Sequence, residues 1–151
     1  MTRIGVLADS HRALTKLRAA LGDLADCDLI VHLGDHEEDM ENMGVAAERL
    51  ITVPGNCDLF SMNPGSRVFE RDGVKVFMTH GNAYGVKYTL LRLALKAKEL
   101  NAALALFGHS HCRAAERDGD VLCLNPDALK DGCYAVVTLD KGKITYEFRS
   151  L

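Results

Sequence analysis

The sequence predicts an α/β protein with mixed β-sheets, in which parallel strands come first along the chain and antiparallel strands last. In residues 3–53, apolar runs of strand length alternate with segments of helix length, which favours parallel β-α-β units. From residue 66 onward, strand-like runs are joined by tight turns such as Arg71-Asp72-Gly73, which favours antiparallel hairpins.

The first third of the chain is predicted to hold three strands and two helices. Residues 3–8 have the pattern of a buried strand, and residues 12–24 carry leucines at helical spacing. Residues 28–33 and 50–53 are predicted to be strands by the same apolar pattern, and residues 37–49 are predicted to form a second, less regular helix.

The rest of the chain is predicted to form one long helix among short strands. Residues 66–70 and 74–79 have the pattern of a hairpin, and an amphipathic helix is expected over residues 86–100, before a strand at 103–107. Two further hairpins are expected from strands over residues 112–117, 121–124, 133–139 and 143–148. Neither a linker nor an internal repeat interrupts the pattern, so residues 1–151 are expected to form a single domain.

Composition limits the classes of function. The 151 residues carry a formal net charge of −3, so a basic surface for nucleic acid is not expected. No apolar stretch reaches the roughly 18–20 residues of a membrane span, and a signal peptide is not expected, because the first residues have a strand pattern. The five cysteines are odd in number and form no Cys-x-x-Cys pair, which is typical of reduced thiols in the cytoplasm.

Five short polar clusters lie where predicted strands end, and together they supply seven oxygen or imidazole side chains that can bind metal. The clusters are Asp9-Ser10-His11, Gly34-Asp35, Gly55-Asn56-Cys57-Asp58, His80-Gly81 and Gly108-His109-Ser110-His111. The candidate ligands are Asp9, His11, Asp35, Asn56, His80, His109 and His111. Because ligands bind beyond the carboxyl ends of strands in α/β sheets, the five loops are expected to converge if these strands lie side by side.

The types and number of these residues point to two metal ions. Carboxylate, amide and imidazole ligands suit Mn, Fe, Ni or Zn, and the near absence of cysteine argues against a structural zinc site. Seven ligands are too many for one ion and fit two ions that share a carboxylate. Two ions about 3.5–4 Å apart can clamp a phosphoryl group and deliver a bridging hydroxide in line with the leaving group.

Each cluster taken alone has a simpler explanation. Gly-Asp after a strand is usually a turn, and Gly-Asn-x-Asp often marks one because Asn and Asp tolerate left-handed backbone. Gly-His-x-His is a more specific pattern. Five clusters in this order, each at a predicted strand end, favour a metal site over chance.

The five clusters resemble the motifs of the calcineurin-like metallophosphoesterases, most closely the small YfcE-like phosphodiesterase group, over essentially the whole chain. The resemblance implies a four-layer α/β/β/α sandwich with two mixed β-sheets. It also implies two divalent ions, usually Mn²⁺, with Ni²⁺, Co²⁺, Fe²⁺ or Zn²⁺ as other occupants. One ion would bind Asp9, His11, Asp35 and His111, and the other would bind Asp35, Asn56, His80 and His109, so that Asp35 bridges them.

Three positions depart from the pattern of these relatives. Cys57 stands where many relatives carry a histidine that protonates the leaving group, although the YfcE-like group shares this cysteine. A thiol suits this task less well than imidazole, so good leaving groups, such as those of aryl phosphodiesters, are expected. Asn82 replaces a common second histidine and can bind phosphate. Asp127 replaces a glycine and would disfavour highly anionic substrates if it points inward.

Other polar residues near the clusters have mainly structural explanations. Arg12 is the nearest obvious cation for a phosphate, with a solvated helix start as the simpler alternative. His32 is expected to pack at a strand end without binding metal. Residues 37–39 are an acidic first turn of the predicted helix, with control of substrate access as the alternative. Cys112 is expected to be buried in the strand that follows it.

The predicted function is that of a cytoplasmic binuclear metal-dependent phosphodiesterase or phosphatase acting on a small phosphoester, with nucleotides among the candidates. Asn56, Cys57 and His80 are the predicted catalytic residues, and Arg12 and Asn82 are the predicted substrate contacts. One alternative is a non-catalytic metal-binding scaffold for protein contacts, as in the retromer subunit with this fold; another is a single structural metal. A scaffold would tolerate ligand loss, yet every expected ligand position is filled. The sequence leaves open the preference for diesters or monoesters, the metal in the cell and the oligomeric state.

Overall fold

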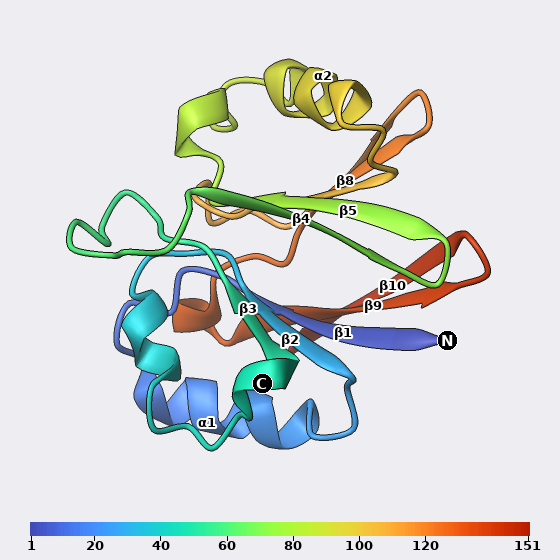
Figure 1. The fold of residues 1–151 in the computed structure, drawn as a ribbon. Helices are drawn as coiled ribbons and strands as arrows, with labels where there is room; N and C mark the ends of the chain where they lie inside the picture. The colour runs from blue at the N-terminus through green and yellow to red at the C-terminus, as the bar shows by residue number, and fades with distance from the viewer.

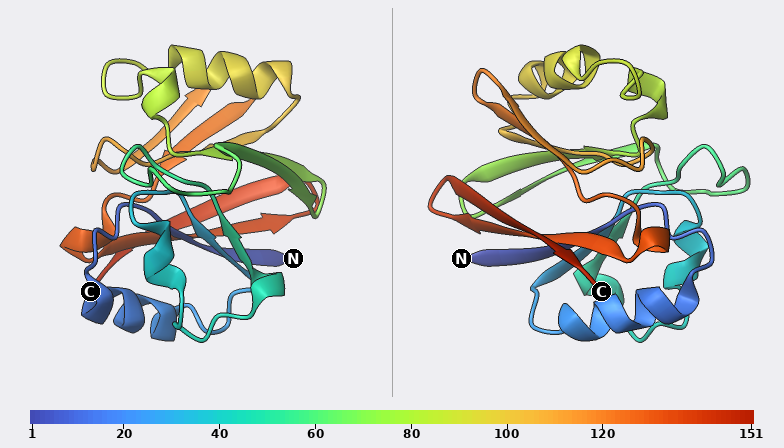
Figure 2. Two further views of the ribbon diagram at one scale, coloured as in Figure 1. Left: turned by 60° about the vertical axis from the view of Figure 1, so that its left-hand side comes forward. Right: turned by 180° about the vertical axis from the view of Figure 1, so that it is seen from behind.

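The computed structural model describes residues 1–151, which form two five-stranded β-sheets packed face to face between helices (Figure 1). The first sheet has the strand order β10-β9-β1-β2-β3, and the second has the order β4-β5-β6-β8-β7. Helix α1 (Leu14–Asp23) covers the outer face of the first sheet, and helix α2 (Leu91–Glu99) covers the outer face of the second. Figure 2 shows the same four layers from other sides. The expected α/β/β/α sandwich with two mixed sheets is therefore confirmed.

Each strand begins and ends within two residues of its predicted bounds. Those of the first sheet are β1 (Thr2–Leu7), β2 (Leu29–His32), β3 (Leu50–Thr52), β9 (Cys133–Asp140) and β10 (Lys143–Ser150). Those of the second sheet are β4 (Ser66–Arg71), β5 (Val74–Thr79), β6 (Leu104–Leu106), β7 (Ala114–Asp118) and β8 (Val121–Asn125). Short 3-10 helices in the connections are η1 (Glu37–Met40), η2 (Ala47–Arg49), η3 (Asn82–Tyr84) and η4 (Leu129–Asp131).

Three apolar clusters hold the layers together. The largest contains 17 buried residues, among them Val6, Val31, Val76 and Leu106, and it fills the space between the sheets. A cluster of 10 buried residues packs between the first sheet and α1, and another of 10 packs between the second sheet and α2. Central strands such as β2, β6 and β8 are buried along their whole length, so their sequences are continuous apolar runs without alternation.

Parallel pairing at the centre of each sheet places the polar clusters at one end of the molecule. Strand β2 pairs in parallel with β1 and β3, and β6 pairs in parallel with β5 and β8. The loops that follow these strands gather on the left in Figure 1. The hairpins β4–β5, β7–β8 and β9–β10 are antiparallel, as predicted. The sequence predicts only antiparallel pairing for the last strands, and the structure adds the parallel pair of β6 and β8.

The helices differ from the prediction in extent. The prediction of a helix over residues 37–49 is wrong. Left-handed backbone at Asn42 (φ 61°) and Gly44 (φ 78°) interrupts the segment, so that it forms only the short 3-10 helices η1 and η2. The helix predicted from residue 86 begins only at Leu91, after a left-handed turn at Gly85 (φ 61°). Helix α1 begins at residue 14 and not at residue 12, because Arg12 is also left-handed, at φ 64°.

Candidate metal centre

Six of the seven predicted ligands lie together at the end of the two sheets. Their oxygen and nitrogen atoms form two groups, within each of which the atoms lie within 4.8 Å of one another. The first group is Asp9, His11, Asp35 and His111, and the second is Asp35, His80 and His109. Asp35 belongs to both. The first sheet supplies Asp9, His11 and Asp35, and the second sheet supplies the three other histidines.

Asp9 follows β1 and is completely buried. Its Oδ2 atom accepts a hydrogen bond from the amide of His109 at 3.1 Å. Its Oδ1 atom lies 3.4 Å from His111 Nε2 and 3.9 Å from His80 Nε2. Burial raises the pKa of this carboxyl group, since its negative charge has lost the solvation of water. A cation at Oδ1 would restore that stabilisation.

Asp35 follows β2 and lies between the two groups of side chains. Its Oδ2 atom is 3.4 Å from His80 Nε2 and 3.6 Å from His11 Nε2, while its Oδ1 atom accepts the amide N–H of Cys57 at 2.9 Å. Burial alone would raise the pKa of Asp35, but the nearby imidazole of His80 and the hydrogen bond from the Cys57 amide outweigh it and hold the pKa well below its usual range. Asp35 is thus held as a carboxylate whose Oδ2 atom faces the imidazole rings of His80 and His11.

His80 follows β5 and is oriented by the backbone of the first sheet. Its Nδ1 atom is 2.8 Å from the carbonyl oxygen of Leu33. Because a carbonyl oxygen can only accept a hydrogen bond, Nδ1 must carry the hydrogen. Nε2 then carries the lone pair, and it lies 3.2 Å from Nδ1 of His109. Such a hydrogen bond on the far ring nitrogen fixes the tautomer of metal-binding histidines. Burial lowers the pKa of His80, but the neighbouring carboxylates of Asp35 and Asp9 have a larger effect. In the metal-free protein the pKa of His80 is therefore raised.

Two buried atoms in the cluster have no hydrogen-bond partner, namely Asp9 Oδ1 and His11 Nε2. A buried polar atom without a partner costs about 1–3 kcal/mol, and native proteins hold few of them. Both atoms face the same group of ligands. Carboxylate oxygens and imidazole nitrogens are common ligands of divalent transition metals, so the residues present fit a bound cation.

The backbone around the cluster is unusual. Asp9, His11, Asp35, His109 and His111 all have left-handed φ angles, between 43° and 70°. Non-glycine residues adopt this conformation at a cost of about 1 kcal/mol or more, and such strain gathers at functional sites. These turns at strand ends bring side chains from several loops toward one point.

Glycines allow the loops to approach closely. A Cβ atom on Gly55 would overlap Asp35 Oδ1, and one on Gly34 would lie 2.5 Å from the amide nitrogen of Gly55. A Cβ atom on Gly108 would lie 3.0 Å from Asp9 Oδ2. The two aspartates that lie deepest in the cluster therefore pack against glycine backbone that a larger residue would displace.

A buried hydrogen-bond network connects the first two loops. His32 Nδ1 accepts the amide of Gly34 at 3.2 Å, and its Nε2 lies 2.9 Å from Ser10 Oγ. Ser10 Oγ in turn donates to Asp39 Oδ2 at 2.7 Å, and this oxygen also accepts the amide of Arg12 at 2.7 Å. Burial lowers the pKa of His32 to about 4, so the ring is neutral at pH 7. His32 lies at the end of β2, as predicted, and supports the loop of Asp9.

Asp58 and Asn125 are supporting residues that the sequence analysis did not single out. The Asp58 carboxylate accepts the amides of Asp35 (2.9 Å), His36 (2.8 Å) and Gly55 (2.9 Å). Buried Asn125 donates to the carbonyl of Gly108 at 3.1 Å. Asp58 lies within a predicted cluster, which is a signal that could have found it. No pattern in the sequence links Asn125 to Gly108, because the two residues lie 17 positions apart.

The remaining predicted residues lie at the edge of the cluster. Asn56 is exposed and its Nδ2 atom lies 3.8 Å from Cys57 Sγ, beside the Cys57 amide that donates to Asp35. Arg12 and Asn82 are exposed, and neither side chain makes a hydrogen bond to the cluster. Asp127 accepts the amide of the next residue at 2.7 Å.

One expectation about the cysteines is wrong. Cys112 is exposed and precedes β7, because the strand begins only at residue 114. Cys57 is also exposed, beside the cluster. Partial loss of hydration at its sulfur atom and the nearby Asp35 carboxylate raise the pKa of the Cys57 thiol, so it keeps its proton at neutral pH.

Comparison with known proteins defines the class to which this fold and cluster belong. Residues 2–142 match the model of the calcineurin-like phosphoesterase superfamily domain, and the chain belongs to this family. A probable metallophosphoesterase of Bacillus subtilis (strain 168), YsnB, is 32% identical over 150 residues, which cover 95% of this chain and 88% of the relative. A phosphodiesterase of Methanocaldococcus jannaschii is 28% identical, and the match covers 82% of each chain.

Solved structures share the fold over nearly the whole chain. A conserved protein of Streptococcus pneumoniae TIGR4, described as a predicted phosphoesterase, is 26% identical with a TM-score of 0.82, covering 99% of this chain and 89% of that one. Vps29 of Entamoeba histolytica reaches a TM-score of 0.79 at 14% identity, covering 99% of both chains. The likeness to Vps29 is one of fold alone. The two mixed sheets thus form the metallophosphoesterase fold.

Proposed function

We propose that this metallophosphoesterase is a binuclear metal-dependent phosphodiesterase, with Asp35 bridging two divalent ions. The observation that carries the proposal is the pair of ligand groups that share Asp35. The unpartnered atoms Asp9 Oδ1 and His11 Nε2 support it, because both belong to the first group. The phosphodiesterase of Methanocaldococcus jannaschii supports the choice of substrate class.

The proposed ligands are those that the sequence predicts. Asp9, His11, Asp35 and His111 would hold one ion, and Asp35, Asn56, His80 and His109 would hold the other. The resemblance to calcineurin-like metallophosphoesterases favours Mn²⁺, and the mixture of carboxylate, amide and imidazole ligands leaves Ni²⁺, Co²⁺, Fe²⁺ and Zn²⁺ as other candidates. When bound, such ions supply positive charge for the phosphoryl oxygens and activate water as the nucleophile.

The protein's own residues orient these groups. The carbonyl of Leu33 holds His80 with Nε2 toward the cluster, and the Cys57 amide holds one oxygen of Asp35, leaving the other for a cation. The protonated Cys57 thiol, exposed beside Asn56, is the proposed proton donor to the leaving group. Arg12 and Asn82 are proposed substrate contacts at the exposed rim. Each would need to turn its side chain toward the cluster.

Hydrolysis of bis-p-nitrophenyl phosphate tests the proposal. Metal-stripped protein should be inactive, and added Mn²⁺ should restore hydrolysis. Asp35→Asn should lose activity by at least about 100-fold and should lose metal at both positions together. If metal analysis shows that one ion remains and most activity survives, the bridging role of Asp35 is wrong.

A second candidate is a metal-binding scaffold for protein contacts. The exposed apolar side chains of Leu59, Phe60 and Met62 favour it, since isolated loops rarely display three such residues without a partner. Tightly metal-bound protein that hydrolyses no phosphoester would support the scaffold and overturn the enzyme.

In the structure, neither helix is long and apolar enough to cross a membrane, and placement in the cytoplasm stays a prediction.

A further inference from the structure

The turn that follows η3 places a lysine at the edge of the metal cluster. Val86 in this turn is buried, and a Cβ atom on Gly81 would lie 2.9 Å from its Cγ2 atom and 3.6 Å from the Cβ atom of Phe107. Gly81 and Phe107 belong to the two loops that carry the histidines of the second ligand group. The next residue after Val86 is Lys87, which is exposed. The packing of Val86 therefore fixes the backbone of Lys87 beside these two loops.

The charge of Lys87 acts on the ligand His109. The pKa of His109 is lowered, most by burial and then by the imidazole of His80 and the ammonium group of Lys87. The opposing effect of the Asp35 carboxylate is smaller, although the ligand atoms of Asp35 and His109 lie within 4.8 Å of each other. Because the interaction of two charges weakens with distance, the Lys87 ammonium group lies close to this histidine.

Lys87 has no anionic partner in the structure. Its side chain forms no ion pair and no hydrogen bond, and the same is true of Arg92 on α2. A Cβ atom on Gly85, in the same turn as Lys87, would lie 3.9 Å from the Nη1 atom of Arg92. By contrast, the two lysines of α2 pair with carboxylates, at 3.6 and 2.7 Å. Two unpaired cations thus lie in or against the turn beside the second ligand group.

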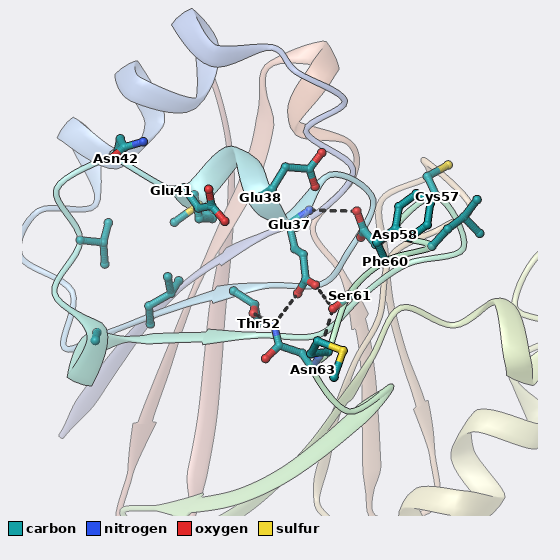
Figure 3. Close-up of a pocket in the computed structure, with 16 residues that line it drawn as sticks. Glu37, Glu38, Glu41, Asn42, Thr52, Cys57, Asp58, Phe60, Ser61 and Asn63 are labelled. Atoms are coloured by element: carbon teal, nitrogen blue, oxygen red, sulfur yellow. Dashed lines mark hydrogen bonds between the residues drawn. The ribbon is translucent and has the colours of Figure 1, made fainter.

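The side of the cluster at His11 has the opposite charge. The rings of His11 and His36 meet edge to face with their centroids 5.2 Å apart, and His36 Nδ1 lies 3.1 Å from the Glu38 carboxylate. Glu37 and Glu41 belong to the same segment, and Figure 3 shows all three glutamates around η1. In Figure 1, η1 and the turn after η3 lie on opposite sides of the ligand loops. The surroundings of the cluster are therefore negative toward η1 and positive toward α2.

We propose that Lys87, assisted by Arg92, binds a second anionic group of the substrate, and that the substrate is a small phosphodiester that carries a further phosphate. This inference rests on the proposed phosphodiesterase function and adds the class of substrate. Lysine binds phosphate as a compact point charge, and two unpaired cations suit the double charge of a terminal phosphate. The glutamates around η1 would repel this group, so it lies toward α2 while the scissile phosphate lies on the metal cluster.

Two substrates that differ by one phosphate test the proposal on the Mn²⁺-loaded protein. They are thymidine 5′-(p-nitrophenyl phosphate) and its 3′-phosphorylated form, which share the scissile bond and the leaving group. The wild type should prefer the phosphorylated form by about fivefold in kcat/KM, the size of an exposed ion pair. Lys87→Gln should reduce the preference to about twofold or less, and Lys87→Arg should retain it.

The matched control is Lys143→Gln, which removes the same charge elsewhere. Lys143 is exposed at the start of β10, after the β9–β10 turn that Figure 1 shows at the end of the molecule opposite to the ligand loops. This variant should keep the preference of the wild type. An equal loss of preference in Lys87→Gln and Lys143→Gln would reflect the net charge of the protein and would overturn a local contact at Lys87.

A binding measurement separates this inference from the proposed function. In calorimetric titrations of the Mn²⁺-loaded protein, thymidine 3′,5′-bisphosphate should bind about fivefold more tightly than thymidine 5′-phosphate, and Lys87→Gln should remove the difference. Without hydrolysis of bis-p-nitrophenyl phosphate, the phosphodiesterase proposal fails while these titrations still test Lys87. Hydrolysis without a preference for the second phosphate, or a preference that survives Lys87→Gln, overturns the lysine contact and leaves the phosphodiesterase in place.

Discussion

Replacing Gly55 by alanine is expected to displace Asp35 from its position among the candidate metal ligands and to leave the fold intact. The Gly55 backbone is not left-handed, so alanine introduces no conformational strain of its own. Its methyl group, however, would overlap Asp35 Oδ1 and lie 2.5 Å from the Asp35 amide nitrogen and 2.9 Å from its Cγ. The substitution therefore acts on the proposed bridging ligand without changing any ligand's chemistry.

The expected magnitude follows from these contacts. Ordinary contacts of carbon atoms begin at about 3.5 Å, so Gly55 or Asp35 must move by about 1 Å to admit the methyl group. A misplacement of about 1 Å in an active site lowers rates by about 100-fold. Overpacking itself costs about 1–3 kcal/mol in the free energy of unfolding. Loss of activity should thus exceed any loss of folded protein at room temperature.

The assay compares Gly55→Ala with Gly65→Ala, where a Cβ atom would meet nothing within 4 Å. For each variant, kcat/KM on bis-p-nitrophenyl phosphate, Mn²⁺ affinity by calorimetry and the urea midpoint of metal-free protein are measured. Gly65→Ala should match the wild type in activity and metal affinity. If Gly55→Ala retains activity and Mn²⁺ affinity within twofold, Asp35 is not held as the structure describes, and the reasoning is refuted.

Four further outcomes follow from the structure. Asp58→Asn should weaken Mn²⁺ binding about 10- to 100-fold in calorimetry, since Asp58 orients the Asp35 loop; unchanged affinity would exclude that role. Metal-free protein should lose up to about 3 kcal/mol as the pH falls from about 6.5 toward 4, because the unfolded chain protonates His32 while its pKa of about 4 keeps the folded ring neutral. In urea titrations, His32→Gln should reduce this dependence of the free energy of unfolding on pH. An unchanged dependence would show that a group other than His32 causes it. Gly22→Ala should stabilise helix α1 by about 0.5–1 kcal/mol, since a Cβ atom there meets nothing within 4 Å; a lower melting temperature would contradict this. Mn²⁺ at 100 times its Kd should add about 2.7 kcal/mol to stability, and an unshifted melting temperature would show that the folded state does not bind it.

The strands and the ends of the strands were the predictable part of this molecule. Buried strands such as β2 and β6 have continuous apolar sequences, and the polar residues that follow them mark where the strands end. Because parallel strands share a direction, their carboxyl ends meet, and candidate ligands such as Asp9 and Asp35 could be grouped without coordinates. Five local patterns in order were sufficient for the family resemblance.

The parts that could not be predicted depend on contacts between distant residues. Asp58 holds the amide of Asp35 from 23 residues away, and Asp39 reaches Ser10 across 29 residues, with no periodic pattern to mark either pair. The helix predicted over residues 37–49 fails because single left-handed residues, Asn42 and Gly44, interrupt a segment whose composition suits a helix. Which side chain accepts a hydrogen bond from which backbone amide, and which residues adopt left-handed backbone, depend on contacts that form only in the folded protein.

The candidate ligands come from both sheets, so a bound ion would contact both halves of the molecule. Neither sheet alone carries a complete set, since Asp9 and Asp35 come from one and His80 and His109 from the other. Bound ions would act as cross-links between the layers, much as a disulfide joins two segments. Any motion that slides one sheet along the other would disassemble both ion positions at once, so metal release and separation of the sheets should be measurable as a single event.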